Sequence, residues 1–560
     1  MPPTSRRTDA LVAVGVGAVA LAVYAVSLLP GTGYSGDTAK WQMLGVVGGV
    51  PHATGYPLYV ALDQAWVAVV PFGSAAWRVN LLSAVLGAAA VGVLYLLLRI
   101  LDVRPAVAAA SALVFAFSGT FWSQAVVAEV YTLHVLFLVT VSACLAHWRT
   151  GAANGWLLAG LGLYALSFGN HLTSIVALPG VAWIVWSDRR RALTRGNAAF
   201  VAAAVLLGAG QYLYLVHLSD VAPYREAQID SLGDVAGYLT GGDFKDAMFA
   251  FGPRALLVDR VPLVLDYLGL EFSVLLVPMA AGMVRGLWRL PPAPRAAAVH
   301  LALLAVGTAL YVLNYDVPDL VVFFLPLFFP LAAFLGIGLE GAARWLEARP
   351  WASPWTVRAG AGALAVLVVL FAAGNRSESS QRGEVAVAER TERAIDAAGR
   401  DAVLLTDDYN DSEYLWYYLI GEGLGDERNL VVADQVTPDE VADYFSSAAG
   451  PVSAAAQTLG VTDPALYTGA RRQARDLAEQ GLDVTAVGDG VWQVGPPAAG
   501  QTVASAGPIE FAMPNARLHA ARAFYGAAAS RAAATRNMTA SPRAGAMTWT
   551  PTGSPSSPLP

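Results

Sequence analysis

The chain has 560 residues, of which 56% are hydrophobic and only 14% are charged, and its mean hydropathy is +0.50. This composition is too apolar for a water-soluble protein of this length and predicts a membrane protein. The formal net charge of -7 is not gathered into single-sign blocks, and no basic face carries interleaved aromatic residues, so we expect no nucleic-acid partner. Cys144 is the only cysteine, which rules out an internal disulfide.

Eleven apolar runs have the length that a helix needs to cross the hydrocarbon layer. In chain order these runs are, to within a few residues, 9–29, 77–98, 105–121, 123–147, 153–170, 171–187, 198–218, 262–284, 296–313, 318–340 and 356–374. The first run is followed by no small-residue cleavage site, so we interpret it as an anchor rather than as a signal peptide. The predicted fold class is therefore an α-helical polytopic membrane protein.

The segment after the first run contains Asp37 and is predicted to form two surface helices. Residues 38–50 carry an apolar stripe at helical spacing, which favours a helix lying on the bilayer with Asp37 near its start. An acid at that position can be no more than a helix cap. Residues 56–71 are short, start and end near proline and contain Asp63, so we interpret them as a second helix at the interface rather than as a twelfth span.

The distribution of arginine predicts the orientation, because cytoplasmic loops collect Lys and Arg. With eleven spans and a cytoplasmic N-terminus, most arginines fall on the inner side, including the run at 189–195, and few fall on the outer side. The predicted location is the plasma membrane, with the C-terminal part outside. The polar segments around Asp37, 119–131, 168–173 and 314–319 then share the outer face.

Beyond residue 375 the composition becomes polar, which predicts a separate outer domain. Residues 402–406 and 430–433 are typical of short buried strands, 411–421 and 438–445 of helices, and 484–494 of a hairpin. We therefore divide the chain into three parts, in which a low-complexity and largely disordered tail carries one expected helix near 515–535. These parts are a transmembrane domain at 1–375, a small α/β domain at 376–497 and the tail at 498–560.

Several short motifs lie at the outer ends of the predicted spans. They are Gly36-Asp37, PHATGYPLY at 51–59, RVNLLS at 78–83, FWSQAVVAEVYTL at 121–133 and GNHLT at 169–173. Together they resemble the signature of one branch of the GT-C superfamily of polytopic glycosyltransferases. That branch, long labelled a domain of unknown function, includes the animal plexin-type protein O-mannosyltransferase. The resemblance covers roughly residues 9–375, and DAVLLTDDYNDSEYLWYY at 401–418 resembles the segment beyond the membrane part in bacterial members.

The resemblance implies transfer of a mannose-like sugar from a polyprenyl-phosphate carrier to a hydroxyl acceptor on the outer face, with inversion at the anomeric carbon. The implied acceptor is protein Ser/Thr or a glycan. Asp37 is then the expected general base, because a carboxylate can take the proton of the attacking hydroxyl. Glu129 is the second catalytic candidate, since an acid inside a predicted span is costly. The residues expected to bind the donor phosphate or the substrate are Lys40, His52, Tyr56, Arg78, Tyr131, Asn170 and His171.

Other interpretations stay open at this point. A polytopic transporter has a similar number of spans, but it is expected to show paired repeats and polar residues at mid-depth rather than at the outer ends. A transferase that modifies a lipid or glycan instead of a protein is a second alternative. Asp266, Glu271, Asp316 and Asp319 are weaker site candidates. No metal-ligand spacing is present, and one acid plus Glu129 leaves open whether a divalent metal assists.

Overall fold

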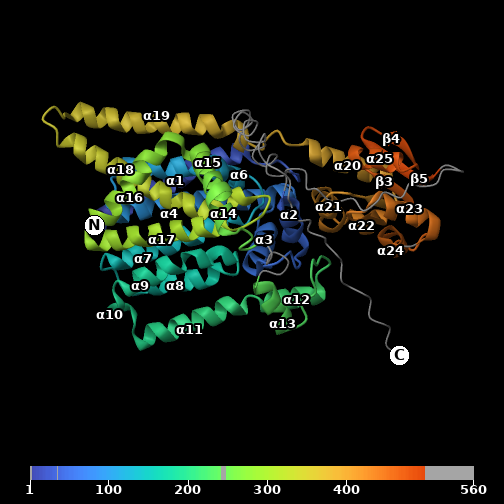
Figure 1. The fold of residues 1–560 in the computed structure, drawn as a ribbon, viewed down its shortest axis with the longest axis horizontal. Coiled ribbons are helices and arrows are strands. Elements are labelled where there is room, and N and C mark those ends of the chain that lie inside the picture. The colour runs from blue at the N-terminus through green and yellow to red at the C-terminus, as the bar shows by residue number, and fades with distance from the viewer. Residues whose placement is uncertain (1–2, 34–35, 241–246, 449, 498–560) are drawn as a thin grey trace.

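The computed structural model describes residues 3–33, 36–240, 247–448 and 450–497. A bundle of long, roughly aligned helices forms most of the molecule, and a small sheet with its own helices lies beyond one end of the bundle (Figure 1). The short helix α10 (Arg189–Ala192) lies at the opposite end of the bundle from this sheet. The expected helix near 515–535 and the tail at 498–560 lie outside the described residues.

Within the described residues, eight helices are long and apolar enough to cross a membrane. This confirms a helical, multi-pass membrane protein. The helices that make these spans are α1 (Pro3–Ser27), α4 (Ala75–Ile100), α7 (Tyr131–Arg149), α11 (Arg195–Gly210) with α12 (Leu213–Val221), α14 (Pro253–Ala255) with η3 (Leu256–Arg260), α15 (Val261–Phe272), η4 (Ser273–Leu275) and α16 (Leu276–Trp288), α17 (Pro292–Leu313), η5 (Leu320–Phe324) with α18 (Leu325–Glu347), and α19 (Pro354–Ser379).

Three of the eleven expected spans are not straight helices of membrane length. The run 105–121 forms α5 (Pro105–Ala116) and α6 (Gly119–Ala125), which are bent by 71° to one another. The runs 153–170 and 171–187 form only the shorter helices α8 (Gly155–Ser167) and η1 (Leu172–Ala177) with α9 (Leu178–Trp186). Hydropathy does not distinguish an apolar helix from an apolar turn beside it, so the runs overstate the lengths of the helices.

The fourth expected span, 123–147, begins later in the structure than the apolar run predicts. Its helix α7 begins at Tyr131, and residues 126–130 form a connection from α6. Glu129 therefore lies in this connection and not within a membrane helix, which corrects the reason for which it was singled out. Its side chain is nevertheless buried by surrounding protein, with 7% of the residue exposed.

Glycine allows close helix packing inside the bundle. A Cβ on Gly282 of α16 would lie 1.8 Å from the carbonyl oxygen of Phe334 in α18, and one on Gly338 would lie 2.0 Å from the carbonyl oxygen of Pro278. Both distances are far below van der Waals contact, so only glycine fits at these crossings. Small residues at such contacts let membrane helices approach without a hydrophobic driving force between them.

The two predicted surface helices exist as α2 (Thr38–Val47) and α3 (Pro57–Val69). Residues Thr38–Gly45 of α2 are buried, and the helix packs against α3, α4 and two segments of the C-terminal part, α21 (Tyr409–Trp416) and η6 (Tyr417–Gly421). The expectation that α2 lies with its apolar stripe on the bilayer is therefore wrong. Its apolar side chains face other parts of the protein, and Figure 1 places α2 between the bundle and the sheet.

The C-terminal part contains one five-stranded sheet in the order β2-β1-β3-β5-β4. Strands β2, β1 and β3 are parallel, whereas β5 pairs antiparallel with β3 and β4. The predicted strands β1 (Ala402–Leu405) and β2 (Leu430–Ala433) and the predicted hairpin of β4 (Leu482–Gly488) and β5 (Val491–Pro497) are confirmed, but β3 (Ala465–Thr468) was missed. The remaining helices of the fold are α13 (Leu232–Leu239), α20 (Ala386–Ala398), α22 (Leu424–Arg428), α23 (Pro438–Ser447), α24 (Gly450–Thr458) and α25 (Arg471–Glu479).

Candidate active site

Asp37 stands at the start of α2, but its carboxylate does not cap the helix. The side chain makes no capping hydrogen bond to the backbone of α2. Instead, Oδ1 lies 3.2 Å from Nζ of Lys40 and accepts a hydrogen bond of 3.0 Å from the hydroxyl of Tyr409. Oδ2 lies 3.7 Å from Nε2 of His52. The capping interpretation of this acid is thus not supported by the geometry.

Lys40 is the buried cation around which this cluster is built. Its side chain has no exposed surface and forms ion pairs with Asp37, Glu226 and Glu413, the last at 3.7 Å between Nζ and Oε1. Nζ also lies 3.1 Å from Nδ1 of His52. Since a buried ammonium needs opposite charge and hydrogen-bond acceptors, these contacts explain how the protein holds it without water.

The charges of the cluster set the protonation state of its carboxyl groups. Burial opposes ionisation of Asp37, but the charge of the Lys40 ammonium and the hydrogen bonds from Lys40 and Tyr409 outweigh it and lower the pKa of the Asp37 carboxyl to about 2. Burial raises the pKa of Glu413 to about 8, against the lowering effect of Lys40. At neutral pH Asp37 is therefore ionised.

His52 links Lys40 to the aromatic residues of the site. Because an ammonium can only donate, Nδ1 of His52 accepts from Lys40, and the proton of the neutral ring lies on Nε2. From there it donates to the hydroxyl of Tyr56 at 3.1 Å. Burial is the main cause that lowers the pKa of His52, which favours this neutral form. His52 and Tyr56 thus orient each other beside Asp37.

His171 lies next along this chain of rings. Its ring is 5.5 Å from that of Tyr56 and 5.7 Å from that of Tyr131, measured between centroids. Nδ1 accepts from the backbone N–H of Thr173 at 3.3 Å, so the neutral ring carries its proton on Nε2. Among the described residues this buried Nε2 has no hydrogen-bond partner. Burial lowers the pKa of His171 well below its usual value.

Glu129 and Asp319 add two further acids to the same region. Ser83 holds the connection that carries Glu129, because its hydroxyl lies 3.1 Å from the backbone nitrogen and 3.3 Å from the carbonyl oxygen of Glu129. Asp319 accepts from the hydroxyl of Tyr131 at 3.4 Å. Burial and the charge of Asp37 raise the pKa of both carboxyl groups, that of Asp319 to about 6.

Two of the residues expected to bind substrate make other contacts. The guanidinium of Arg78 donates to the backbone carbonyls of Val67 and Val70 at 2.6 and 3.1 Å, where it closes the end of α3. The amide of Asn170 donates to the carbonyl of Val130 at 3.3 Å. Arg78 is thereby held at the end of α3, whereas Asn170 ties the His171 segment to the connection that contains Glu129. Their roles in binding stay predictions.

Three residues of the cluster were missed by sequence reasoning. Tyr409 and Glu413 come from the C-terminal domain, and Glu226 comes from the loop after α12. The only sequence signal for Tyr409 and Glu413 was the motif at 401–418, to which no role could be given without its contacts. Within the described residues, no group of three or more His, Cys, Asp or Glu side chains could hold a metal ion. Lys40 instead supplies positive charge among the carboxylates.

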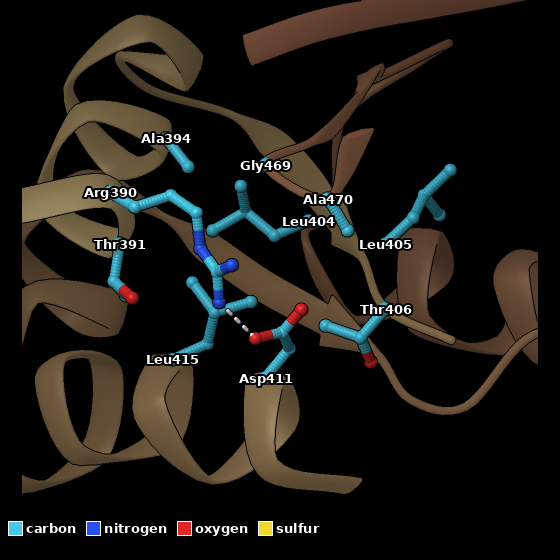
Figure 2. A pocket seen from close by; sticks show the side chains of 10 residues that line it. All are labelled: Arg390, Thr391, Ala394, Leu404, Leu405, Thr406, Asp411, Leu415, Gly469 and Ala470. Atoms are coloured by element: carbon cyan, nitrogen blue, oxygen red, sulfur yellow. Dashed lines mark hydrogen bonds and ion pairs between the residues drawn. The ribbon is translucent and has the colours of Figure 1, made fainter. Parts of the chain in front are cut away.

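A hollow lies within the C-terminal domain, at the ends of β1 and β3. Figure 2 shows its lining, in which Arg390 and Asp411 form an ion pair with each other. The lining does not include Asp37 or Lys40. The acids and cation described above therefore form a separate cluster, between the bundle and the C-terminal domain.

Two sequence comparisons match part of the chain. Residues 41–194 match the family model described as the N-terminal domain of protein O-mannosyl-transferase TMEM260. The protein O-mannosyl-transferase TMEM260 of Mus musculus is 32% identical over 213 residues, which are 36% of this chain and 29% of the mouse protein. The chain thus matches less than a third of the length of this curated relative.

Solved structures extend the likeness to most of the chain. ArnT from Cupriavidus metallidurans bound to undecaprenyl phosphate has a TM-score of 0.54 at 15% identity, with 86% of this chain and 97% of that chain covered. An oligosaccharyltransferase of Archaeoglobus fulgidus in complex with Zn and sulfate has a TM-score of 0.50 at 12% identity, with 86% and 73% covered. At these identities the likeness concerns the fold. Residues 41–194 are accordingly similar to the N-terminal domain of protein O-mannosyl-transferase TMEM260, and the chain shares its fold with these two solved structures.

Proposed function

We propose that this protein is a membrane glycosyltransferase that moves a mannose-like sugar from a polyprenyl-phosphate carrier to a protein Ser/Thr hydroxyl. The observation that carries the proposal is the Asp37 carboxylate, which is ionised, does not cap its helix and is held between Lys40, His52 and Tyr409. The family of residues 41–194 and the GT-C fold support the same reaction class.

In the proposed reaction, Asp37 takes the proton of the acceptor hydroxyl while the hydroxyl oxygen attacks the anomeric carbon. The new carbon–oxygen bond forms as the bond from the anomeric carbon to the carrier phosphate breaks, and the electron pair leaves with the phosphate. Attack from the side opposite the leaving group inverts the anomeric configuration. Oδ1 of Asp37 is occupied by Lys40 and Tyr409, so Oδ2 is the oxygen that receives the proton.

The donor phosphate is assigned to the ring cluster of Tyr56, Tyr131 and His171. His171 directs a buried Nε2–H that lacks a partner among the described residues, and such a donor is suited to a phosphate oxygen. Lys40 is fully buried among acids, so in this proposal it supports Asp37 rather than contacting the carrier. The carrier phosphate is negative, and a neutral histidine can donate to it without loss of a proton.

The proposed function is tested by incubating the purified full-length protein with radiolabelled polyprenyl-phosphate sugars and either a Ser/Thr peptide, a glycan or water. Transfer of mannose to the peptide is the expected result. Transfer only to the glycan would mean that the acceptor is a glycan and not a protein. Transport of a solute without any sugar transfer would mean that the protein is a transporter. No turnover of any donor, in a protein that is folded by thermal unfolding, would contradict the reaction.

His171→Ala is expected to raise the KM for the lipid donor about 10-fold or more, because it removes a hydrogen bond to a charged phosphate. The measurement is donor saturation at constant acceptor. His300→Ala is the matched control, since His300 is also buried and is hydrogen-bonded to Ser142 within the bundle at 2.9 Å. Equal donor KM values in the two variants would exclude His171 from the donor site.

The proposed orientation places the N-terminus in the cytoplasm and the sheet domain outside. Arg190 and Glu427 are both exposed and lie in α10 and α22, at opposite ends of the molecule (Figure 1). A cysteine at Glu427 is expected to react with a membrane-impermeant maleimide in intact cells, and one at Arg190 only after permeabilisation. The unmodified chain is the control, because Cys144 is buried. The reverse labelling pattern would invert the proposed topology.

A further inference from the structure

The motif TDDYNDSEYLWYY, residues 406–418, has so far no function, although it is the part of the outer domain that lies against α2. Three contacts dock it there. The backbone N–H of Gly36 donates to Oδ1 of Asn410 at 3.0 Å, that of Ala76 donates to the hydroxyl of Tyr417 at 3.2 Å, and the rings of Tyr224 and Trp416 lie 5.6 Å apart. The motif of the C-terminal domain thus contacts Gly36 at the start of α2, Ala76 in α4 and Tyr224 in the loop after α12.

Two side chains of α21 continue from this contact into the cluster around Asp37. The hydroxyl of Tyr409 donates to Oδ1 of Asp37 at 3.0 Å, and Nζ of Lys40 lies 5.0 Å from the centre of the Tyr409 ring. One turn later, Oε1 of Glu413 lies 3.7 Å from Nζ of Lys40. Glu413 has no exposed side-chain surface, so it is inserted fully between the outer domain and the membrane part.

We infer that the outer domain completes the catalytic centre through α21, with Tyr409 as the residue that positions Asp37. This inference rests on the proposed function. A carboxylate has two equivalent oxygens and rotates freely unless one of them is bound. Tyr409 and Lys40 both engage Oδ1, so the carboxylate is held with Oδ2 turned towards His52 and available to the acceptor hydroxyl. The outer domain is then required for turnover even where it contacts no substrate.

Tyr409→Phe tests this role, because it retains the ring and its packing and removes only the hydroxyl. The expected result is a fall of kcat on the order of 10- to 100-fold, the usual value of a hydrogen bond to a charged group. The KM for the lipid donor is expected to stay unchanged, since Tyr409 does not contact the His171 cluster in this arrangement. A purely structural role would instead lower the amount of folded protein and leave the kcat of that fraction unchanged.

Tyr418→Phe is the matched control. Tyr418 lies in η6, nine residues later in the same motif, and its hydroxyl likewise donates to a carboxylate, Oε1 of Glu392, at 2.7 Å. That contact lies within the outer domain, so kcat is expected to stay within about twofold of the unmodified protein. Equal kcat values in Tyr409→Phe and Tyr418→Phe would overturn the inference.

A double-mutant cycle separates this inference from the proposed function. The thermal unfolding of Asp37→Ala, Tyr409→Phe and the double variant is compared with that of the unmodified chain. A stability loss in the double variant that is smaller than the sum of the two single losses supports the contact. A loss equal to that sum overturns it, whether or not any sugar is transferred. An inactive unmodified protein with a coupled cycle would contradict the proposed reaction and leave the docking of α21 on Asp37 supported.

Discussion

Asp37→Asn is expected to retain the fold and to lose transfer by on the order of 10² to 10⁴-fold, the contribution of a positioned general base. The amide has the size of the carboxyl group but cannot take a proton at neutral pH. Since the Asp37 side chain makes no capping hydrogen bond, its replacement removes no cap. Lys40 keeps Glu226 and Glu413 as partners. The measurement is kcat with saturating donor, together with the midpoint of thermal unfolding.

Asp9→Asn is a matched control for this substitution. Oδ1 of Asp9 accepts from the hydroxyl of Tyr95 at 3.1 Å and from Nε of Arg99 at 2.8 Å, so this acid also contacts one tyrosine and one cation. It lies in α1 and is not part of the Asp37 cluster. Asp9→Asn is expected to lower stability without a specific loss of kcat. If the two variants transferred sugar equally well, the catalytic carboxylate would have to be sought at Glu129.

Lys40→Met is expected to produce the largest loss of stability, about 3–5 kcal/mol at neutral pH. It removes the cation that pairs with Asp37, Glu226 and Glu413, and leaves these carboxyl groups without that counter-charge. The free energy of unfolding, measured with denaturant at a series of pH values, gives the size of this loss. A loss below about 0.5 kcal/mol, which is usual for surface substitutions, would mean that Lys40 is not the charge partner of the cluster.

The pH dependence of this loss has a defined sign. In the unmodified protein the pKa of Asp37 is lowered to about 2, so its ion pair stabilises the fold above the unfolded pKa of about 3.9 and this contribution is lost as the pH falls through 2. Without Lys40, burial raises the pKa of Asp37 instead. The variant is then least stable, relative to the unmodified protein, at neutral pH, and the difference shrinks as acidification protonates the carboxyl groups.

The addition of Asp37→Asn to Lys40→Met supplies an internal control for this explanation. If an uncompensated carboxylate causes the instability, removal of its charge is expected to recover part of the lost free energy of unfolding at neutral pH. If the methionine destabilises the protein by its shape alone, the second substitution brings no recovery. The comparison therefore separates electrostatics from packing in the Lys40 pocket.

Much of the local structure of this protein is determined by its sequence alone. The long apolar runs determined most of the membrane helices, and short apolar runs bounded by polar residues determined β1, β2 and the hairpin of β4 and β5. These features depend on residues that are neighbours along the chain, so hydropathy and spacing suffice to predict them. The motif resemblance likewise pointed to Asp37, and the structure groups it with His52, Tyr56 and His171.

The tertiary structure alone decided what surrounds Asp37. The sequence suggested that α2 lies on the bilayer, but α3, α4, α21 and η6 pack around it and bury it. Glu226, Tyr409 and Glu413 meet Lys40 or Asp37 from segments far along the chain. A buried ammonium is stabilised by whichever acids the fold brings to it. Periodicity within one segment carries no information on a partner hundreds of residues away, so these contacts had to come from the packing of the outer domain against the membrane part.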